Sequence, residues 1–178
     1  NAKPIFADIE EDTFNIDPEK IAGKITKKTK AILPVDLYGH PYDYGEIKKI
    51  ADENGLKIVE DACQAVGASY HGRKCGLLGD ISAFSFYATK NLITAEGGII
   101  TTDDEKLAEL ARMFRHHGQS EKIRYEYYDI GYNYRMTDIL AAIGVEQLKK
   151  LEDLTKKRIS NAEHLTKGLK NVNGIKVP

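Results

Sequence analysis

The sequence predicts an α/β protein built on a mixed, mostly parallel sheet. In the first half of its 178 residues, short apolar runs rich in strand-forming residues alternate with a segment of helical periodicity. A strand, a helix and a second strand joined by short connections form a right-handed crossover, in which the two strands are parallel. In the second half, the apolar residues recur at helical spacing.

The first crossover lies near the start of the chain. Residues 31–35 (Ala-Ile-Leu-Pro-Val) form an apolar run, and the turn-forming residues 38–41 close it. Residues 44–54 carry apolar side chains at helical spacing and stop at Gly55, a common residue at helix C-termini. Residues 57–59 (Lys-Ile-Val) then form a second buried strand, which we expect to pair in parallel with the first.

Three further strand-like segments follow. Residues 66–75 have the pattern of a small hairpin, and residues 81–86 (Ile-Ser-Ala-Phe-Ser-Phe) have that of another inner strand. Residues 98–102 follow after only about a dozen residues, whereas a parallel crossover needs roughly that many and a helix as well. We therefore expect the strand at 98–102 to run antiparallel.

The second half is predicted to be helical. Asp103 and Asp104 cap a helix that stops by Gly118, and the polar, aromatic residues 119–135 show no clean period and form a loop. Thr137 caps a long helix, and a further helical pattern runs from about residue 155 to 169. The apolar stripe of the long helix consists of Leu140, Ile143, Leu148 and Leu151.

Composition excludes several classes of protein. The net charge of −1 creates no long-range field for nucleic acid, and no apolar run approaches the roughly 20 residues that span a bilayer. Cys63 and Cys75 lack the spacing of metal ligands, so we expect reduced thiols in a cytoplasmic protein without a metal site. The chain begins without methionine and both ends look cut, and we expect it to be a piece of a larger polypeptide.

Four polar residues are expected to share one edge of the sheet. Asp61 and Gln64 follow the strand at 57–59, Ser85 closes the strand at 81–86, and Lys90 lies just beyond it. In open α/β sheets, ligands bind beyond the carboxyl ends of the parallel strands, so these side chains are candidates for one ligand site.

Their chemistry is that of a pyridoxal 5′-phosphate enzyme. Lys90 would form a Schiff base with the cofactor aldehyde, and the carboxylate of Asp61 would hold the pyridine nitrogen protonated. Gln64 would donate its amide to the phenolic oxygen, and the hydroxyl of Ser85 would bond the phosphate. The catalytic candidates are Lys90 and Asp61.

Each residue also has an ordinary explanation. A lysine after a strand is usually solvated, and an acidic pair such as Glu60 and Asp61 at a strand end is more often a helix cap than a cofactor ligand. Ser85 can satisfy a neighbouring backbone group. Such explanations become hard to maintain for all positions once their spacing is considered together.

The chain also carries four specific motifs. They are Glu-Asp-Ala-Cys-Gln-Ala at residues 60–65, Gly-Asp-Ile-Ser-Ala-Phe-Ser-Phe-Tyr-Ala-Thr-Lys-Asn at 79–91, Glu-Gly-Gly at 96–98 and Gly-Tyr-Asn-Tyr-Arg-Met at 131–136. Together they closely resemble the nucleotide-sugar aminotransferases of the DegT/StrS type, and the likeness covers essentially the whole chain.

The resemblance implies the three-layer large domain of a fold type I aminotransferase, incomplete in this chain. Residues 1–150 would belong to that cofactor-binding domain, and residues 151–178 to a helix that leads into a small C-terminal domain. Such enzymes move an amino group, usually from glutamate, to a keto carbon of a nucleotide-linked sugar, as in polysaccharide biosynthesis. They are homodimers with shared active sites, and Asn133 matches the asparagine that reaches the cofactor phosphate of the neighbouring subunit.

Several alternatives stay open. A related sugar dehydratase uses the same cofactor with histidine at the lysine position, and a regulatory relative keeps the fold without turnover. A generic nucleotide-binding module is disfavoured because no Gly-x-Gly-x-x-Gly follows a strand. The histidines and arginine at 115–117 could meet a diphosphate or be solvated helix-end cations. The sugar, its keto carbon and the nucleotide are left open.

Two departures from the family pattern matter. The family usually has Gly-Glu-Gly-Gly after the lysine, where this chain has Ala95 followed by Glu-Gly-Gly, and we expect the extra methyl only to stiffen the loop. The phosphate-binding turn and the ring that stacks on the cofactor belong to segments upstream of this chain. We therefore expect the isolated 178-residue chain to show no transamination.

Overall fold

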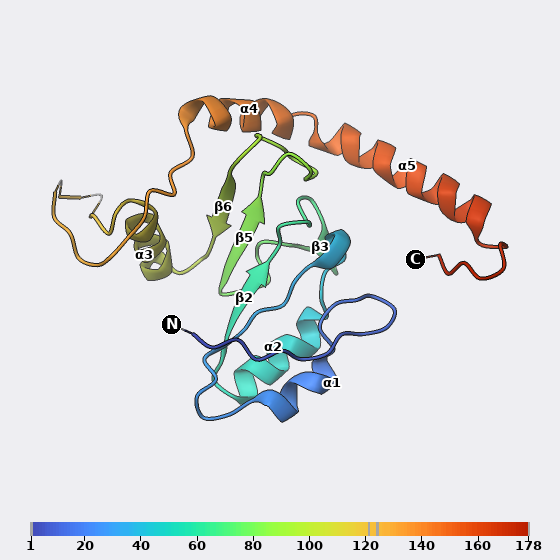
Figure 1. Cartoon of the computed structure of the whole chain (residues 1–178), viewed down its shortest axis with the longest axis horizontal. Coiled ribbons are helices and arrows are strands. Elements are labelled where there is room, and N and C mark those ends of the chain that lie inside the picture. The colour runs from blue at the N-terminus through green and yellow to red at the C-terminus, as the bar shows by residue number, and fades with distance from the viewer. Residues whose placement is uncertain (1, 121, 124, 178) are drawn as a thin grey trace.

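The computed structural model describes residues 2–120, 122–123 and 125–177 (Figure 1). It confirms a mixed, mostly parallel sheet, whose strands lie side by side in the order β1, β2, β5, β6. These strands are β1 (Ala31–Ile32), β2 (Lys57–Asp61), β5 (Ile81–Ser85) and β6 (Gly98–Thr101).

The crossover from β1 to β2 forms as the sequence predicts. The connecting helix α2 (Tyr44–Glu53) begins at Asp43, whose side chain accepts a hydrogen bond from the backbone N–H of Glu46. It ends at Asn54, and β1 and β2 then pair in parallel with Ala31 opposite Lys57. A short 3₁₀ turn, η2 (Leu37–Gly39), separates β1 from α2. The first strand is shorter than residues 31–35, because Pro34 cannot donate to a ladder.

Strand β2 also pairs in parallel with β5, with Val59 opposite Ile81 and Asp61 opposite Ala83. Strand β6 runs antiparallel to β5, as its short connection predicts, and Gly98 lies opposite Ser85. A Cβ atom at Gly98 would come within 2.5 Å of the carbonyl oxygen of Phe84, so only glycine permits this close pairing.

The hairpin expected at residues 66–75 is present as a separate two-stranded sheet. It consists of β3 (Ser69–Tyr70) and β4 (Arg73–Lys74), which pair antiparallel. His71 and Gly72 between them both have positive φ, at 45° and 85°, as a tight two-residue turn requires.

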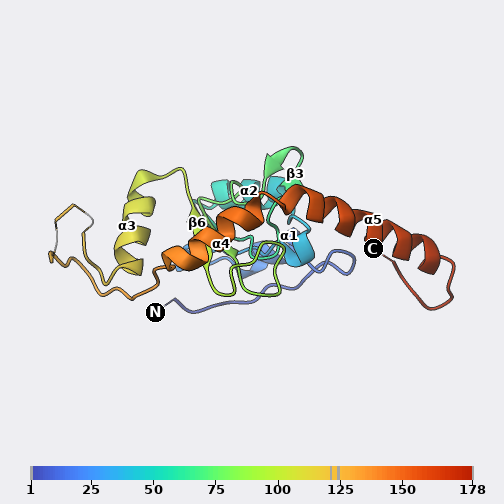
Figure 2. The same cartoon turned by 90° about the horizontal axis from the view of Figure 1, so that it is seen from above.

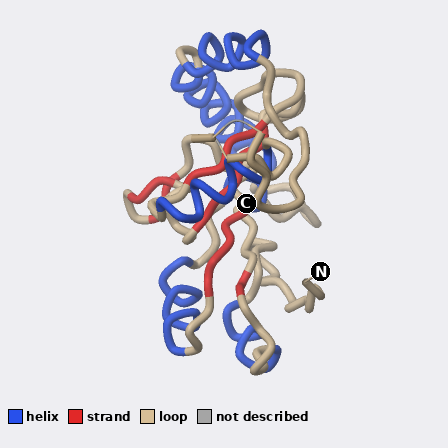
Figure 3. The backbone as a smooth tube through the Cα atoms, turned by 90° about the vertical axis from the view of Figure 1, so that its left-hand side faces the viewer, coloured by secondary structure: helices blue, strands red, loops and turns tan. Residues whose placement is uncertain are grey.

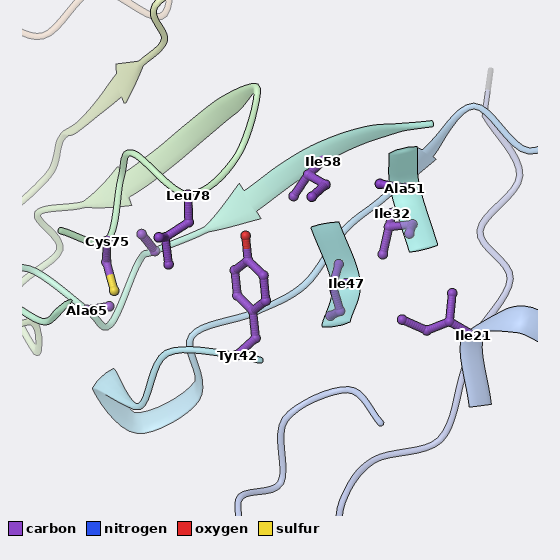
Figure 4. Packing of buried hydrophobic residues seen from close by; sticks show 10 residues of the cluster. Ile21, Ile32, Tyr42, Ile47, Ala51, Ile58, Ala65, Cys75 and Leu78 are labelled. Atoms are coloured by element: carbon purple, nitrogen blue, oxygen red, sulfur yellow. The ribbon is translucent and has the colours of Figure 1, made fainter. Parts of the chain in front are cut away.

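The core lies between the β1–β2 half of the sheet and two N-terminal helices. Helix α1 (Pro18–Ile21) is capped by Asp17 and continues into the 3₁₀ turn η1 (Ala22–Lys24). Figure 4 shows how its last residue, Ile21, packs with side chains of α2 and both strands. The labelled members of this cluster are Ile21, Ile32, Tyr42, Ile47, Ala51, Ile58, Ala65, Cys75 and Leu78.

The third helix and the loop after it also match expectation. Helix α3 (Glu105–Arg115) is capped by Asp104, whose carboxylate accepts from the N–H groups of Lys106 and Leu107. The described part of 119–135 folds back on itself through isolated bridges and contains no helix or strand. This segment lies beside α3, on the side of β6 away from β2 (Figures 1 and 2).

The last two helices differ from the prediction of one long helix reaching Leu151. Helix α4 (Asp138–Leu148) is capped by Thr137, and α5 (Leu151–Leu169) starts after a turn at Lys149 and Lys150. The predicted apolar stripe therefore crosses a helix boundary. Neither proline nor glycine marks this break, which is why the periodicity did not show it.

Helices lie at both ends of the strands (Figure 3). The α1–α2 pair is beside one end, and α4 and α5 run across the other (Figure 1). No helix in the described ranges combines the length and the apolar character needed to cross a membrane.

The packing of α2 on the sheet generates a first prediction. Ile47 is fully buried, so Ile47→Ala should lower the free energy of unfolding by about 2–5 kcal/mol through lost burial and the cavity left behind. Chemical denaturation measures this change. Lys49→Ala, on the exposed side of the same helix, is the control and should change the value by less than about 0.5 kcal/mol. Equal effects of the two substitutions would contradict the packing described here.

Candidate functional site

The candidate site lies where two neighbouring parallel strands end. The arrows of β2 and β5 point to the same end of the sheet in Figure 1, and Asp61 and Ser85 are their last residues. Gln64 and Lys90 follow in the connections that leave these strands. All four side chains are half-buried, which suits groups that must be both held by the protein and open to a ligand.

The Asp61 carboxylate is fixed at the end of β2. Its Oδ1 accepts a hydrogen bond from the backbone N–H of Cys63 at 3.0 Å. The backbone of Asp61 is held on the β1 side as well, because its N–H donates to Pro34 and its carbonyl accepts from Asp36 at 3.0 Å. The acid therefore sits on a strand end bonded to both neighbours, which gives it a defined direction.

Gln64 is oriented by a backbone donor from another segment. Its Oε1 accepts from the N–H of Tyr38 at 2.7 Å, so the oxygen of the amide is identified and its NH₂ group is left to donate. The donor lies in η2, where Tyr38 has φ 57° and Gly39 has φ 81°. A Cβ at Gly39 would lie 3.0 Å from the carbonyl oxygen of Gln64, so this turn is docked closely on the segment after β2.

Lys90 sits in a loop that closes on itself. The loop starts at Phe86, whose N–H donates to Gly97 and whose carbonyl accepts from Thr94, each at 2.8 Å. Inside it, the N–H of Lys90 donates to Tyr87 at 2.9 Å, and the N–H of Tyr87 donates to Ser85 Oγ at 3.3 Å. Ser85 thus uses its oxygen as an acceptor and keeps its hydroxyl hydrogen for a ligand.

Lys90 and Asp61 both act on the thiol of Cys63. Burial, and then the hydrogen bond and charge of Asp61, raise the pKa of Cys63 to about 11, while the positive charge of Lys90 acts in the opposite direction. The amine and the carboxylate are therefore near the same side chain, although they lie 29 positions apart in sequence. The thiol itself stays protonated at neutral pH and is a poor nucleophile.

The four side chains fit pyridoxal phosphate. The donor set comprises a carboxylate for a protonated ring nitrogen, an amide NH₂ for a phenolic oxygen, a hydroxyl for a phosphate and a primary amine for an aldehyde. Each of the first three is oriented by a backbone N–H, from Cys63, Tyr38 and Tyr87. This chemistry matches the cofactor expected from the sequence.

Asn133 lies apart from these four residues. It pairs with His116 in an isolated antiparallel bridge at the end of α3. Its Oδ1 accepts from Arg135 Nε at 3.1 Å, and Arg135 Nη1 also lies 2.8 Å from His116 Nδ1. The exposed Asn133 belongs to the loop on the far side of β6, so the structure does not bring it to Lys90 within one chain.

Glu60 is a residue whose importance the sequence analysis missed. It is fully buried and accepts hydrogen bonds from the N–H groups of Gly76, Leu78 and Gly79 and from Ser82 Oγ. It is therefore neither a helix cap nor a rim residue. The alternation of side chains along a strand was the available signal, because it places Glu60 on the opposite face from Asp61.

The loop that carries Lys90 also contains Ala95, at the position where the family resemblance predicts glycine. The φ of Ala95 is 70°, in the left-handed region that favours glycine. The methyl group therefore adds steric strain to the loop that carries Lys90, and most non-glycine residues avoid this conformation.

Relief of this strain is a second prediction. Ala95→Gly should relieve about 1–2 kcal/mol of strain in the folded state. The greater freedom of glycine in the unfolded chain offsets about 0.4–1 kcal/mol of this, so the free energy of unfolding should rise by the difference. Thermal denaturation measures the effect. Ala88→Gly, in the same loop and without a positive φ, is the control and should be destabilising by about 0.4–1 kcal/mol. If both substitutions destabilise the protein alike, the left-handed conformation of Ala95 is wrong.

Comparison with known proteins identifies relatives of the whole chain. The model of the DegT/DnrJ/EryC1/StrS aminotransferase family matches residues 1–178. The spore coat polysaccharide biosynthesis protein SpsC of Bacillus subtilis is 43% identical over 187 residues, which cover 99% of this chain and 48% of SpsC. A GDP-perosamine synthase of Caulobacter vibrioides is 45% identical over 152 residues, covering 85% of this chain and 41% of the synthase.

Solved structures of an aminotransferase and of a keto-sugar dehydratase superpose on this chain. The aminotransferase TlmJ from Streptoalloteichus hindustanus superposes with a TM-score of 0.93 at 34% identity, over 99% of this chain and 48% of TlmJ. An E. coli GDP-4-keto-6-deoxy-D-mannose-3-dehydratase with bound hydrated PLP superposes with a TM-score of 0.87 at 33% identity, over 94% and 47%. The chain spans about half the length of the curated relatives it matches.

Proposed function

Because the chain belongs to the DegT/DnrJ/EryC1/StrS aminotransferase family, we propose that it carries the cofactor site of a nucleotide-sugar aminotransferase. The reaction moves an amino group from glutamate to a keto carbon of a nucleotide-linked sugar, through a Schiff base between Lys90 and pyridoxal phosphate. The observation that carries the proposal is the parallel pairing of β2 and β5, which places Asp61, Ser85 and the loop of Lys90 at one end of the sheet.

The residues of the rim have separate tasks. When bound, pyridoxal phosphate supplies an electron sink for the carbon from which a proton is removed. Asp61 holds a proton on the ring nitrogen by a charge-assisted hydrogen bond. Gln64 donates its NH₂ group to the phenolic oxygen, and Ser85 donates its hydroxyl to the phosphate. The amine of Lys90 would hold the cofactor through its aldehyde and, as a free base, would accept and return the transferred proton.

The sugar substrate is supported by the relatives. A GDP-perosamine synthase is 45% identical to this chain, and a dehydratase of a GDP-linked keto sugar shares its fold. The dehydratase is the second candidate function because of that structural likeness. The resemblance to the family gives such dehydratases histidine at the position of Lys90, and an amine there favours amino transfer.

A second copy of the chain is proposed to complete the site. Asn133 lies in the loop beside α3, where it pairs with His116, and in a homodimer it would reach the cofactor phosphate of the partner. Helix α4 supports this arrangement, because it exposes apolar side chains on more than one side, which a partner or further chain would cover. They are Ile139, Ile143, Val145 and Leu148. Residues 1–150 then form part of the large domain, and 151–178 lead into a small one.

The assignment of Lys90 is tested by trapping. Borohydride reduces the C=N bond between a lysine and pyridoxal phosphate to a stable C–N bond, so mass spectrometry of the digested protein should locate the pyridoxyl group on Lys90. In the intact enzyme that contains this chain, Lys90→Ala should lose this label and amino transfer together. Lys49→Ala, which changes an exposed lysine of α2, should keep both. A label that persists in Lys90→Ala would remove Lys90 from the site.

The role of Asp61 gives a further prediction. Asp61→Asn keeps the shape of the side chain but removes its charge, so the ring nitrogen loses its anionic partner. We expect a loss of about 2–4 kcal/mol of transition-state stabilisation, as for other preorganised electrostatic contacts. The measurement, made on the intact enzyme that contains this chain, is kcat/KM for transfer from glutamate to a panel of nucleotide-linked keto sugars. Asp104→Asn, which preserves the cap of α3, is the matched control, and equal activities of the two variants would contradict the role.

A further inference from the structure

A buried acidic cluster lies behind the candidate site, on the opposite face of β2 from Asp61. Asp36 and Glu60 are both 0% exposed, and Cys75 is 6% exposed. One ligand atom of each lies within 4.8 Å of the others. Tyr42, also fully buried, faces the same groups, because Glu60, Asp36 and Cys75 all raise the pKa of its hydroxyl after burial itself.

Among the described residues, the groups that act on the pKa of Asp36 include no cation. Glu60 comes from β2, Cys75 from the segment after β4 and Tyr42 from the segment before α2. Each of these groups is an acid, so ionisation can only make it negative. Burial and the neighbouring Asp36 keep the thiol of Cys75 protonated by raising its pKa. A second negative charge beside Glu60 would therefore have no cation to balance it among these neighbours.

The two carboxyl groups differ in their donors. Glu60 accepts four hydrogen bonds, from three backbone N–H groups and from Ser82 at 2.5 Å, and these donors suit a carboxylate. Asp36 accepts one at Oδ1, from the N–H of Tyr42 at 3.1 Å. Its Oδ2 and the hydroxyl of Tyr42 have no hydrogen-bond partner among the described residues. An ionised Asp36 would leave a buried charge poorly solvated.

Asp36 also begins the turn that holds the candidate site. Its backbone N–H donates to the carbonyl of Asp61 at 3.0 Å, and two residues later the N–H of Tyr38 fixes Gln64 Oε1 at 2.7 Å. Its side chain also accepts a hydrogen bond from the backbone N–H of Tyr42, three residues after the turn ends at Gly39. A shift of the Asp36 side chain would therefore also move the backbone N–H groups that hydrogen-bond to Asp61 and Gln64.

We propose that Asp36 is a positioning residue that stays protonated at pH values where an exposed aspartate is ionised, and that this neutral carboxyl keeps residues 36–39 docked on Asp61 and Gln64. The proton allows Asp36 to lie beside the Glu60 carboxylate without repulsion. Loss of the proton places two negative charges in one buried site, pushes the turn away from β2 and loosens both cofactor ligands. The link to cofactor binding rests on the proposed function, whereas the protonation of Asp36 does not.

The sign of the pH dependence follows from the same cluster. Burial, and to a lesser degree the charge of Glu60, raise the pKa of Asp36 to about 7, above its ordinary value of 3.8. The folded state then retains a proton that the unfolded state has released. Its contribution to stability is complete below about pH 4 and is lost as pH rises towards and through 7.

A divalent cation is the alternative way to balance these charges, because two carboxylates and a thiol are possible ligands. The geometry favours the proton. Glu60 already directs its oxygens at four donors, so a cation would have to compete with the N–H groups that hold residues 76–79. Elemental analysis of the purified protein decides between the two, and one equivalent of metal that is lost in Asp36→Asn would overturn the proposal.

The first test observes the proton directly. ¹³C NMR of carboxyl-labelled protein should show one aspartate that titrates near pH 7 and disappears from the spectrum in Asp36→Asn. Asp43→Asn is the matched control, since it changes an exposed aspartate at the end of the same turn and keeps a side chain able to cap α2. An Asp36 signal that is already ionised at pH 6 would overturn the proposal, whether or not the protein binds pyridoxal phosphate. This measurement needs only the unsubstituted protein if Asp36→Asn fails to fold.

The second test measures binding of pyridoxal phosphate itself across pH. The dissociation constant of the unsubstituted protein and of Asp43→Asn should rise above pH 7, by at most about tenfold per pH unit, the limit for one linked proton. For Asp36→Asn, the dissociation constant should not show this rise above pH 7. The same pH profile in all three proteins would refute the positioning role. If the unsubstituted protein binds no cofactor while Asp36 titrates near pH 7, the proposed function is wrong but the protonation of Asp36 is confirmed.

Discussion

The parallel pairing of β2 with β5 is the constraint on which the candidate site depends. Because the two strands run in the same direction with Asp61 opposite Ala83, both end at one edge of the sheet. The acid at the end of one strand and the lysine beyond the other are thereby brought to the same edge, and the charges of both act on the pKa of the Cys63 thiol. An antiparallel pairing would send them to opposite ends of the sheet, so the direction of β5 decides whether a site exists.

A second constraint is the alternation of side chains along β2. Glu60 and Asp61 are adjacent, yet one is buried among the N–H groups of residues 76–79 and the other faces the rim. The same strand therefore contributes one carboxylate to the buried interior and the next to the candidate site. The turn that begins at Asp36 adds a third connection, because it contacts Glu60 by its side chain and Asp61 by its backbone.

Much of this arrangement could be predicted from the sequence, for physical reasons that differ by element. The strand–helix–strand pattern required a parallel pair, and the short connection before residues 98–102 excluded a crossover, so both strand directions were predicted correctly. The backbone donor from Tyr38 to Gln64 could not be predicted, because every residue has an N–H and no side chain signals its use. The strain at Ala95 had a signal in the glycine expected there, but its φ came only from the structure.

The most direct test of the central claim, that the joint end of β2 and β5 is a pyridoxal phosphate site, is a crystal structure of the protein with that cofactor. We expect continuous electron density from Lys90 Nζ to the cofactor. We also expect a carboxylate oxygen of Asp61 within hydrogen-bond distance of the ring nitrogen, about 2.7–2.9 Å. A cofactor bonded to another lysine, or one bound with its ring nitrogen away from Asp61, would contradict the claim.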